Sequence, residues 1–233
     1  MGPLRASTCA REVSLELDHI FVFCKPDSSY GQWLKSFGLV DTHRRQHPGQ
    51  GTENICFCFE NAFIELLWVN DEGETRSPLI ARTGLYERSR HRDLGACPFG
   101  IAWRGSGQIP TWPYRPPYMP PQVAIDVATD GDDPTQPMMF RSPGDSAPSA
   151  WPTERRGNLQ SDAGFQSVRL QRLAMPSDKS PSPALQTLAS NLGFDLCNAG
   201  SSYRMDLRLD RRMGEAPITL SLHDGLEGDD RRV

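Results

Sequence analysis

Proline is distributed unevenly along this chain, and this limits where a core can form. Of the 20 prolines, eleven lie between Pro110 and Pro152. Proline lacks the backbone N–H of a sheet ladder and fixes φ, so this stretch should be extended surface chain with short edge strands at most. Its one internal strand candidate is 122–128. The sequence therefore predicts two core-forming parts separated by a core-poor insert.

Charge and composition narrow the class of ligand. The net charge is −4 and the isoelectric point is near 5.7, which argues against a nucleic-acid partner. No apolar run is long enough to span a membrane, and the N-terminus has no apolar signal-peptide core. The six cysteines form no CxxC pair, as expected of reduced thiols. These features predict a cytoplasmic protein that binds a small molecule, with no nucleic-acid or membrane partner.

Before the insert, the sequence predicts a strand, a helix and three more strands. Residues 15–23 first alternate and then become apolar on both faces, as a buried strand does. A turn and a cap follow, and apolar residues at helical spacing predict a helix that ends at Gly38. Strands are expected over 39–45, 54–60 and 62–69. One face of the first strand is expected to carry Leu15, Leu17, His19, Phe21 and Phe23.

Two elements are expected between this region and the proline-rich stretch. Ser77 followed by Pro78 is a helix cap with proline at the first helical position, which predicts a helix to about Asp93. A short strand is expected over 99–104.

The C-terminal third repeats the same order of elements. A strand is expected at 165–170, a helix at 183–194 and a hairpin at 203–209 and 218–222. We interpret the chain as two βαβββ modules that flank an insert. The predicted divisions are a disordered N-terminus at 1–13, a first module at 14–70, an insert at 71–164, a second module at 165–224 and a flexible C-terminus at 225–233.

Four segments carry a family resemblance. They are Leu17-Asp18-His19-Ile20, Phe37-Gly38-Leu39, the loop His47-Pro48-Gly49-Gln50-Gly51-Thr52-Glu53-Asn54 and the strand Phe63-Ile64-Glu65-Leu66-Leu67. Together they resemble the glyoxalase-like branch of the vicinal-oxygen-chelate superfamily, which includes isomerases, lyases, dioxygenases and binding proteins. The resemblance implies an α+β fold in which paired βαβββ modules form a cupped mixed sheet around a divalent metal and a small substrate.

The resemblance implies that His19 and Glu65 project into the cup as metal ligands, with Glu65 as ligand or catalytic base. Imidazole and carboxylate suit Zn, Mn, Fe or Ni, and a carboxylate between Ile64 and Leu66 is costly to bury without a cation or donors. In the alternative interpretation, His19 is a hydrogen-bonded core histidine and Glu65 faces water or pairs with an arginine.

The second module lacks matching ligands. Ser167 stands where His19 would repeat, and the Glu65 position falls near Leu220. Two protein ligands are too few for a tight site, so the set would need completion from His43, His47 or His223. Metal binding therefore stays an open expectation.

The loop at 47–52 is the most distinctive polar segment. Its glycines permit close backbone approach to a ligand, and polar side chains in and beside it can donate and accept hydrogen bonds. The predicted substrate-binding residues are Arg45, His47, Gln50, Thr52 and Asn54. A turn that carries the chain into the next strand would explain the glycines equally well.

These observations favour a glyoxalase-like enzyme that acts on a small oxygenated metabolite, polarised either by a divalent metal as Lewis acid or by the polar loop. Lyase, isomerase and dioxygenase chemistry all stay open. The competing class is a non-catalytic protein that binds or sequesters a small molecule without metal. Two modules can form a cup within one chain, so both a monomer and a homodimer are compatible with the sequence.

Overall fold

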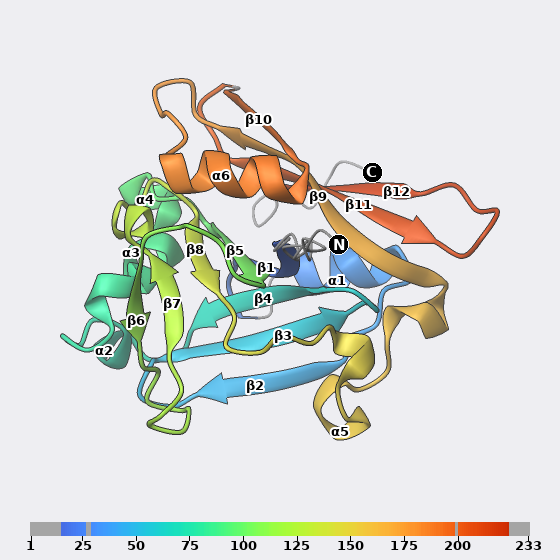
Figure 1. Ribbon diagram of the computed structural model, residues 1–233, viewed down its shortest axis with the longest axis horizontal. Coiled ribbons are helices and arrows are strands. Elements are labelled where there is room, and N and C mark those ends of the chain that lie inside the picture. The colour runs from blue at the N-terminus through green and yellow to red at the C-terminus, as the bar shows by residue number, and fades with distance from the viewer. Residues whose placement is uncertain (1–14, 27–28, 199, 224–233) are drawn as a thin grey trace, which may run out of the picture.

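The computed structural model describes residues 15–26, 29–198 and 200–223, which form two sheets (Figure 1). The larger has eight strands in the order β2-β3-β4-β1-β5-β8-β7-β6, and the smaller has four in the order β10-β9-β11-β12. The predicted disordered N-terminus at 1–13 and flexible C-terminus at 225–233 lie outside the described residues. Within the described ranges, no helix has both the length and the apolar character needed to cross a membrane.

The first half of the large sheet has the predicted strand, helix and three strands. These are β1 (Glu16–Phe23), α1 (Ser29–Ser36), β2 (His43–His47), β3 (Thr52–Cys58) and β4 (Phe63–Val69). The first strand pairs in parallel with the fourth, and β3 lies antiparallel to β4 and β2. The βαβββ order and the mixed α+β class are confirmed.

The second half of the large sheet is built by a segment that lies wholly within the predicted insert. Its strands are β5 (Phe99–Arg104), β6 (Thr111–Tyr114), β7 (Ile125–Ala128) and β8 (Met138–Arg141). Here too the first strand pairs in parallel with the fourth, and β5 lies antiparallel to β1 at the centre of the sheet. Proline is accommodated because the strands are short and Pro113 lies on the edge strand β6.

The predicted second module has its predicted elements but a different pairing. They are β9 (Phe165–Met175), α6 (Pro183–Leu192), β10 (Asp195–Asn198), β11 (Arg204–Arg211) and β12 (Ile218–His223). In this sheet β9 lies between β10 and β11, whereas in the first module the opening strand pairs with the last. The order of elements along a chain does not determine which strands pair. In the large sheet, β1–β4 of the first module lie beside β5–β8, whereas β9–β12 form a sheet of their own.

The helix expected over 77–93 is interrupted. A short helix, α2 (Glu72–Thr75), precedes the segment, which itself forms α3 (Leu85–Ser89) and α4 (His91–Leu94). Gly84 has a left-handed φ of 65° and Arg90 has a ψ of 27°, so neither continues an α-helix. The remaining short helices are α5 (Thr153–Arg156) and 3-10 turns at Ala81–Thr83, Thr129–Asp132, Pro148–Ala150 and Gln160–Ala163.

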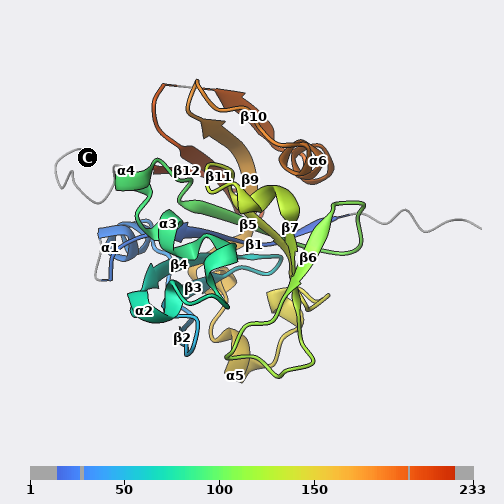
Figure 2. The ribbon, with the colours of Figure 1, turned by 90° about the vertical axis from the view of Figure 1, so that its left-hand side faces the viewer.

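The large sheet separates two apolar clusters. The outer cluster joins the convex face of the sheet, including Ile20 and Ile64, to α1, α6 and the four-stranded sheet (Figure 2). The inner cluster covers the concave face and includes Phe21, Phe23 and Phe140. Side chains alternate between the two clusters along β1 and β4, as the pleat of a strand requires.

A β-bulge in β1 changes the predicted alternation. Leu17 pairs with Trp103 and His19 pairs with Ala102, so Asp18 is an extra residue with no partner on β5. Leu17 consequently packs with the outer cluster, whereas Phe21 belongs to the inner one. The prediction that Leu15 and Leu17 share a face with His19 is therefore wrong, because it assumed an unbroken period of two.

Candidate functional site

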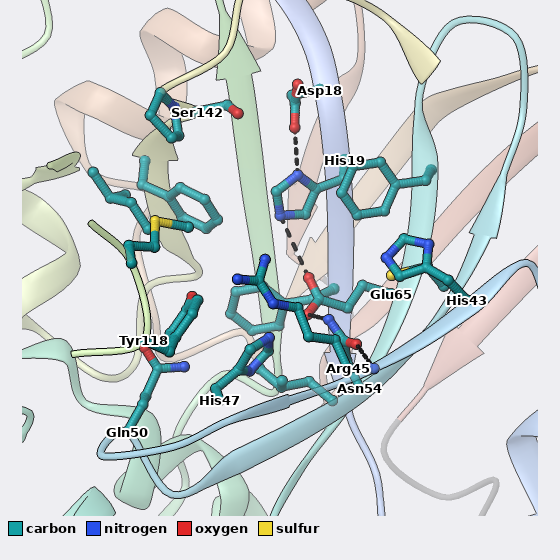
Figure 3. Close-up of a pocket in the computed structure, with 18 of the residues that line it drawn as sticks. Asp18, His19, His43, Arg45, His47, Gln50, Asn54, Glu65, Tyr118 and Ser142 are labelled. Carbon is teal, nitrogen blue, oxygen red and sulfur yellow. Dashed lines mark hydrogen bonds and ion pairs between the residues drawn. The ribbon is translucent and has the colours of Figure 1, made fainter. Parts of the chain in front are cut away.

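A cavity of about 390 Å³ opens on the concave face of the large sheet. Its walls are mostly apolar or aromatic and come from both halves of the sheet, with Trp151 added by the segment before α5. Polar side chains gather on the β1, β2, β3 and β4 side (Figure 3). Among the side chains labelled there are Asp18, His19, Arg45, His47, Asn54 and Glu65.

The bulge in β1 places Asp18 beside His19. Asp18 Oδ1 lies 2.6 Å from His19 Nδ1, and Asp18 Oδ2 accepts a hydrogen bond from Arg104 at 3.2 Å. The Arg104 guanidinium also donates to the Asn61 carbonyl at 2.9 Å and pairs with Glu16 at 3.3 Å. Bulges commonly redirect a side chain beside a functional site, and here the bulge links a buried arginine, a carboxylate and an imidazole in series.

The charge of Asp18 determines which ring nitrogen of His19 carries the proton. Burial raises the pKa of Asp18, but its hydrogen bond and charge interaction with His19 and the charge of Arg104 lower it more, so the net pKa is below the ordinary 3.8. An ionised carboxylate only accepts hydrogen bonds, so His19 Nδ1 carries a proton. The other nitrogen, Nε2, is then the basic atom that faces the cavity.

Glu65 is held between His19 and Asn54. Its Oε2 lies 3.4 Å from His19 Nε2, and its Oε1 accepts a hydrogen bond from Asn54 Nδ2 at 2.6 Å. The Arg45 backbone N–H donates to Asn54 Oδ1 at 3.1 Å. Because a backbone N–H can only donate, this contact fixes which end of the Asn54 amide faces Glu65. Glu65 thus sits in a defined position although it is largely buried.

The loop at 47–52 is tied down by its own contacts. The N–H groups of Gln50 and Gly51 donate to the His47 carbonyl, and that of Gly49 donates to Glu74 at 2.7 Å. Gly51 has a φ of 76°, and a Cβ there would lie 2.2 Å from the carbonyl oxygen of Asp71. The glycines therefore serve the turn and its close packing, and these backbone N–H groups are already engaged within the protein.

Side chains from this loop support the cavity wall. Thr52 Oγ1 lies 2.9 Å from His47 Nδ1 and accepts from Gln50 Nε2 at 2.8 Å, and the Tyr114 hydroxyl donates to Gln50 Oε1 at 2.7 Å. Because Thr52 already accepts from Gln50, its hydroxyl proton can be donated to His47 Nδ1. His47 and Gln50 line the cavity, whereas Thr52 is fully buried behind them.

His47 is a neutral, aromatic part of the wall. Burial, followed by the charges of Arg45 and His43, lowers its pKa to about 3. Its ring stacks on Tyr118 with centroids 4.5 Å apart, and the Arg45 guanidinium lies 4.9 Å from the Tyr118 ring centre. At neutral pH, His47 contributes hydrogen bonding without positive charge.

The donor set does not fit a tight divalent-metal site. Among the described residues, no cluster of three or more His, Cys, Asp or Glu side chains is placed to hold an ion. His19 and Glu65 supply two donors, and the Phe140 ring lies edge-on 5.2 Å from the His19 ring on the opposite half of the sheet. A protein zinc site normally uses at least three protein ligands.

Neither the second-module positions that correspond to His19 and Glu65 nor the histidines expected to complete the set supply a third ligand. Ser167 donates to Asp210 and Leu220 is buried in the outer core, both in the four-stranded sheet. His223 ends β12, and its carbonyl accepts from Tyr30 on the outer side of the large sheet. His47 is engaged with Thr52, while His43 lines the cavity with its Nδ1 unpaired among the described residues.

Most of the predicted site residues come together. Arg45, His47, Gln50 and Asn54 line one cavity with His19 and Glu65, and Thr52 supports it. Asp18 and Arg155 were not among the predicted site residues. Asp18 had a signal in the adjacent Asp-His pair, but a regular strand would place it on the opposite face, and Arg155 comes from a segment whose path the sequence did not predict.

The large sheet thus forms a cup whose polar side chains lie on one side. Residues 17–104 match the family described as "Glyoxalase-like domain". This match covers the first half of the large sheet and β5, and over that part of the chain it confirms the predicted resemblance. No curated protein gives a significant match.

Three solved structures match this chain distantly. A hypothetical protein from Staphylococcus aureus is 11% identical with a TM-score of 0.44, and the match covers 90% of this chain and 86% of that one. Methylmalonyl-CoA epimerase from Mycobacterium tuberculosis is 14% identical with a TM-score of 0.35, over 54% and 85% of the two chains. A mutant of 4-hydroxymandelate synthase from Streptomyces coelicolor is 11% identical with a TM-score of 0.37, over 91% and 64%. At these scores, nothing about activity is transferred to this chain.

Proposed function

We propose that the cavity binds a small oxygenated molecule and that Glu65 and His19 exchange a proton with it. The observation that carries this proposal is the buried Glu65 carboxylate, fixed by Asn54 and 3.4 Å from the one His19 nitrogen that Asp18 leaves open. Three groups that position one another beside an apolar cavity form an acid–base arrangement.

The proposed chemistry is proton abstraction next to a carbonyl group. Glu65 takes the proton of the C–H bond, and the electron pair of that bond moves to the carbonyl oxygen to give an enolate. Nε2 of His19 is placed to receive the proton from Glu65.

The surroundings strengthen these interactions. Phe63 stacks on the His19 ring with centroids 4.2 Å apart, and Phe140 closes the opposite side. Apolar rings keep water away from the acid–base pair, and charge interactions are stronger where water is excluded.

The test measures deuterium uptake from D₂O at the CH₂ group beside the ketone of butyrophenone and of β-benzoylpropionate. Both are aromatic ketones of the same chain length, and the methyl group at the end of butyrophenone is replaced by a carboxylate in β-benzoylpropionate. We expect the wild-type protein to accelerate exchange of at least one probe, and Glu65→Gln to lower that rate by about 100-fold or more.

Controls separate chemistry from folding. Glu60→Gln removes an exposed carboxylate from the turn after β3 and should keep the wild-type rate. Thermal melting and circular dichroism check that Glu65→Gln is folded. Equal exchange by wild type and Glu65→Gln would contradict the proposed role of Glu65.

The apolar second half of the cup supports one alternative, a protein that binds its ligand without transforming it. That function predicts binding of the probes, followed by NMR, with no exchange above the uncatalysed rate. Loss of binding in a bulky variant of the apolar wall, such as Met138→Trp, would then locate the ligand in the same cavity.

A further inference from the structure

We propose that the ligand is a monocarboxylate with an apolar body, and that its carboxylate binds between Arg45 and Arg155 at the cavity mouth. This inference rests on the proposed function, because it names the substrate class of the same cavity. It follows from two arginines that line the cavity from different elements without ion-pair partners in the described part of the chain.

Arg45 differs from its neighbour in β2. Arg44 is neutralised by Glu53 and lies over Trp68, with its charge directed to a partner within the protein. Arg45 lies over the Tyr118 ring, and no described carboxylate forms an ion pair with it. Stacking on an aromatic ring holds a guanidinium in place while its N–H groups stay available.

Arg155 repeats this arrangement from α5. Its guanidinium lies 4.0 Å from the centre of the Trp151 ring, and Trp151 itself lines the cavity. Arg156, the next residue, donates to the Trp151 carbonyl and is outside the cavity lining. Of these two adjacent arginines, only Arg155 thus lines the cavity.

The two charges act on the same part of the cavity. Burial lowers the pKa of His43, and the charges of Arg45 and then Arg155 lower it further. His43 lies in β2 on the cavity wall, so both guanidinium groups are close enough to disfavour a third positive charge there. An anion at this mouth would relieve that repulsion.

The remaining features favour a carboxylate over a phosphate. A phosphate site typically offers several free backbone N–H groups, but those of Gly49, Gln50 and Gly51 are engaged within the loop. Glu154 also lines the mouth, which limits the positive charge and disfavours a dianion. A planar carboxylate matches the guanidinium fork, and the aromatic walls accept the apolar body.

The experiment compares the same two probes by binding. NMR titration measures the dissociation constants of β-benzoylpropionate and butyrophenone for the wild type, Arg45→Gln, Arg155→Gln and the double variant. We expect the wild type to prefer the carboxylate by about tenfold or more, each single variant to weaken its binding by about tenfold, and butyrophenone binding to stay within about twofold.

Arg115→Gln is the matched control. Arg115 is exposed in the segment that bears Tyr118 but does not line the cavity, so its loss removes one nearby charge without removing a proposed contact. The preference for the carboxylate should persist in this variant. A general effect of net charge would instead reduce it as much as Arg45→Gln does.

The results distinguish this inference from the proposed function. Equal affinity of wild type for the two probes, no binding of β-benzoylpropionate, or full retention of the preference in the double variant would each overturn the monocarboxylate proposal. Glu65-dependent exchange of butyrophenone would in that case still support the acid–base function. Conversely, arginine-dependent carboxylate binding without Glu65-dependent exchange would leave the ligand class intact and refute the chemistry.

Discussion

The two halves of the large sheet have the same strand pairing and opposite chemistry. On the concave face, β1, β3 and β4 present His19, Asn54 and Glu65, whereas β5 and β8 present Gly100, Ala102, Met138 and Phe140. His19 and Ala102 are direct partners across the centre of the sheet. A ligand in the cup therefore meets hydrogen-bonding and ionisable groups on one side and hydrocarbon on the other.

The two halves share a backbone arrangement but not the side chains that line the cavity. The parallel pairing of first and fourth strands recurs in both halves, because it depends on the backbone. The polar side chains of the first half have no counterparts in the second half. Some positions of the apolar half are also packed too closely to hold a larger side chain. A Cβ on Gly100 would lie 2.0 Å from the Phe21 ring, so even alanine there would force the ring to move.

The largest expected effect concerns the one buried charge that β5 supplies to the polar half. Arg104→Met leaves Asp18 without its guanidinium partner, and we expect a loss of about 3–5 kcal/mol in the free energy of unfolding. Urea denaturation at pH 7 measures it. Arg141→Met, on the exposed end of β8, is the control and should cost about 0.5 kcal/mol or less.

The pH dependence of the Arg104→Met variant provides a second check. The pKa of Asp18 is lowered in the folded protein, so its stabilisation is present above the unfolded value of 3.8 and is lost as the pH falls through the folded value. The difference in stability between wild type and variant should therefore shrink below about pH 4. A constant difference at all pH values would indicate lost packing alone.

We expect His47, in the polar half, to make the stability of the protein sensitive to acid. Its folded pKa is about 3 against 6.5 for the ordinary group, mainly through burial, so the unfolded chain takes up the proton first as the pH falls. Between pH 7 and pH 4, we expect the wild type to lose about 3 kcal/mol more stability than His47→Gln. Urea denaturation across this range measures the slope.

A substitution in the apolar half is the control for this slope. Met138→Leu keeps the volume and adds no titratable group, so it should retain the wild-type pH dependence. An identical slope in His47→Gln and the wild type would show that other groups cause the acid sensitivity.

The first half of the fold could be predicted because each element carries its own signal. Alternation marks β1, helical spacing and Gly38 delimit the first helix, and the aromatic strands of the hairpin are continuous. In the second half, β5 matches the strand expected over 99–104 and β7 lies within the candidate at 122–128. The edge strand β6 and the strand β8 were not predicted, because they are four residues each and lie among prolines. Such strands form because a neighbouring strand offers its edge, which is a property of the folded sheet.

The candidate site could likewise be predicted in part from the sequence. His19 and Glu65 were identified from residue type in apolar strands, and Arg45, His47, Gln50 and Asn54 from the loop and its flanks. Asp18 was not, because its position depends on a one-residue bulge that arises from pairing with β5. Within the described part of the chain, the lack of a third metal donor depends in turn on which strands complete the cup.

Adding a metal-binding side chain to the apolar half should make the two halves chemically more alike. Phe140→His places an imidazole where a ring already lies 5.2 Å from His19, and it would complete a set with His19 and Glu65. We expect Zn²⁺ affinity, measured by isothermal titration calorimetry, to rise by about tenfold or more over the wild type. Phe140→Leu, which adds no donor, should leave it unchanged.

The smallest expected effect tests whether the proline-rich segment supports the polar half. Tyr114→Phe removes the hydroxyl that donates to Gln50 and keeps the buried ring. We expect a loss of about 1 kcal/mol in stability, because one buried acceptor loses its partner. Exchange and carboxylate binding should change less than threefold, since Glu65, His19 and Arg45 keep all their contacts. A loss of exchange as large as that of Glu65→Gln would mean that the segment positions the acid–base pair itself, and the division between a polar and an apolar half would then no longer describe the site.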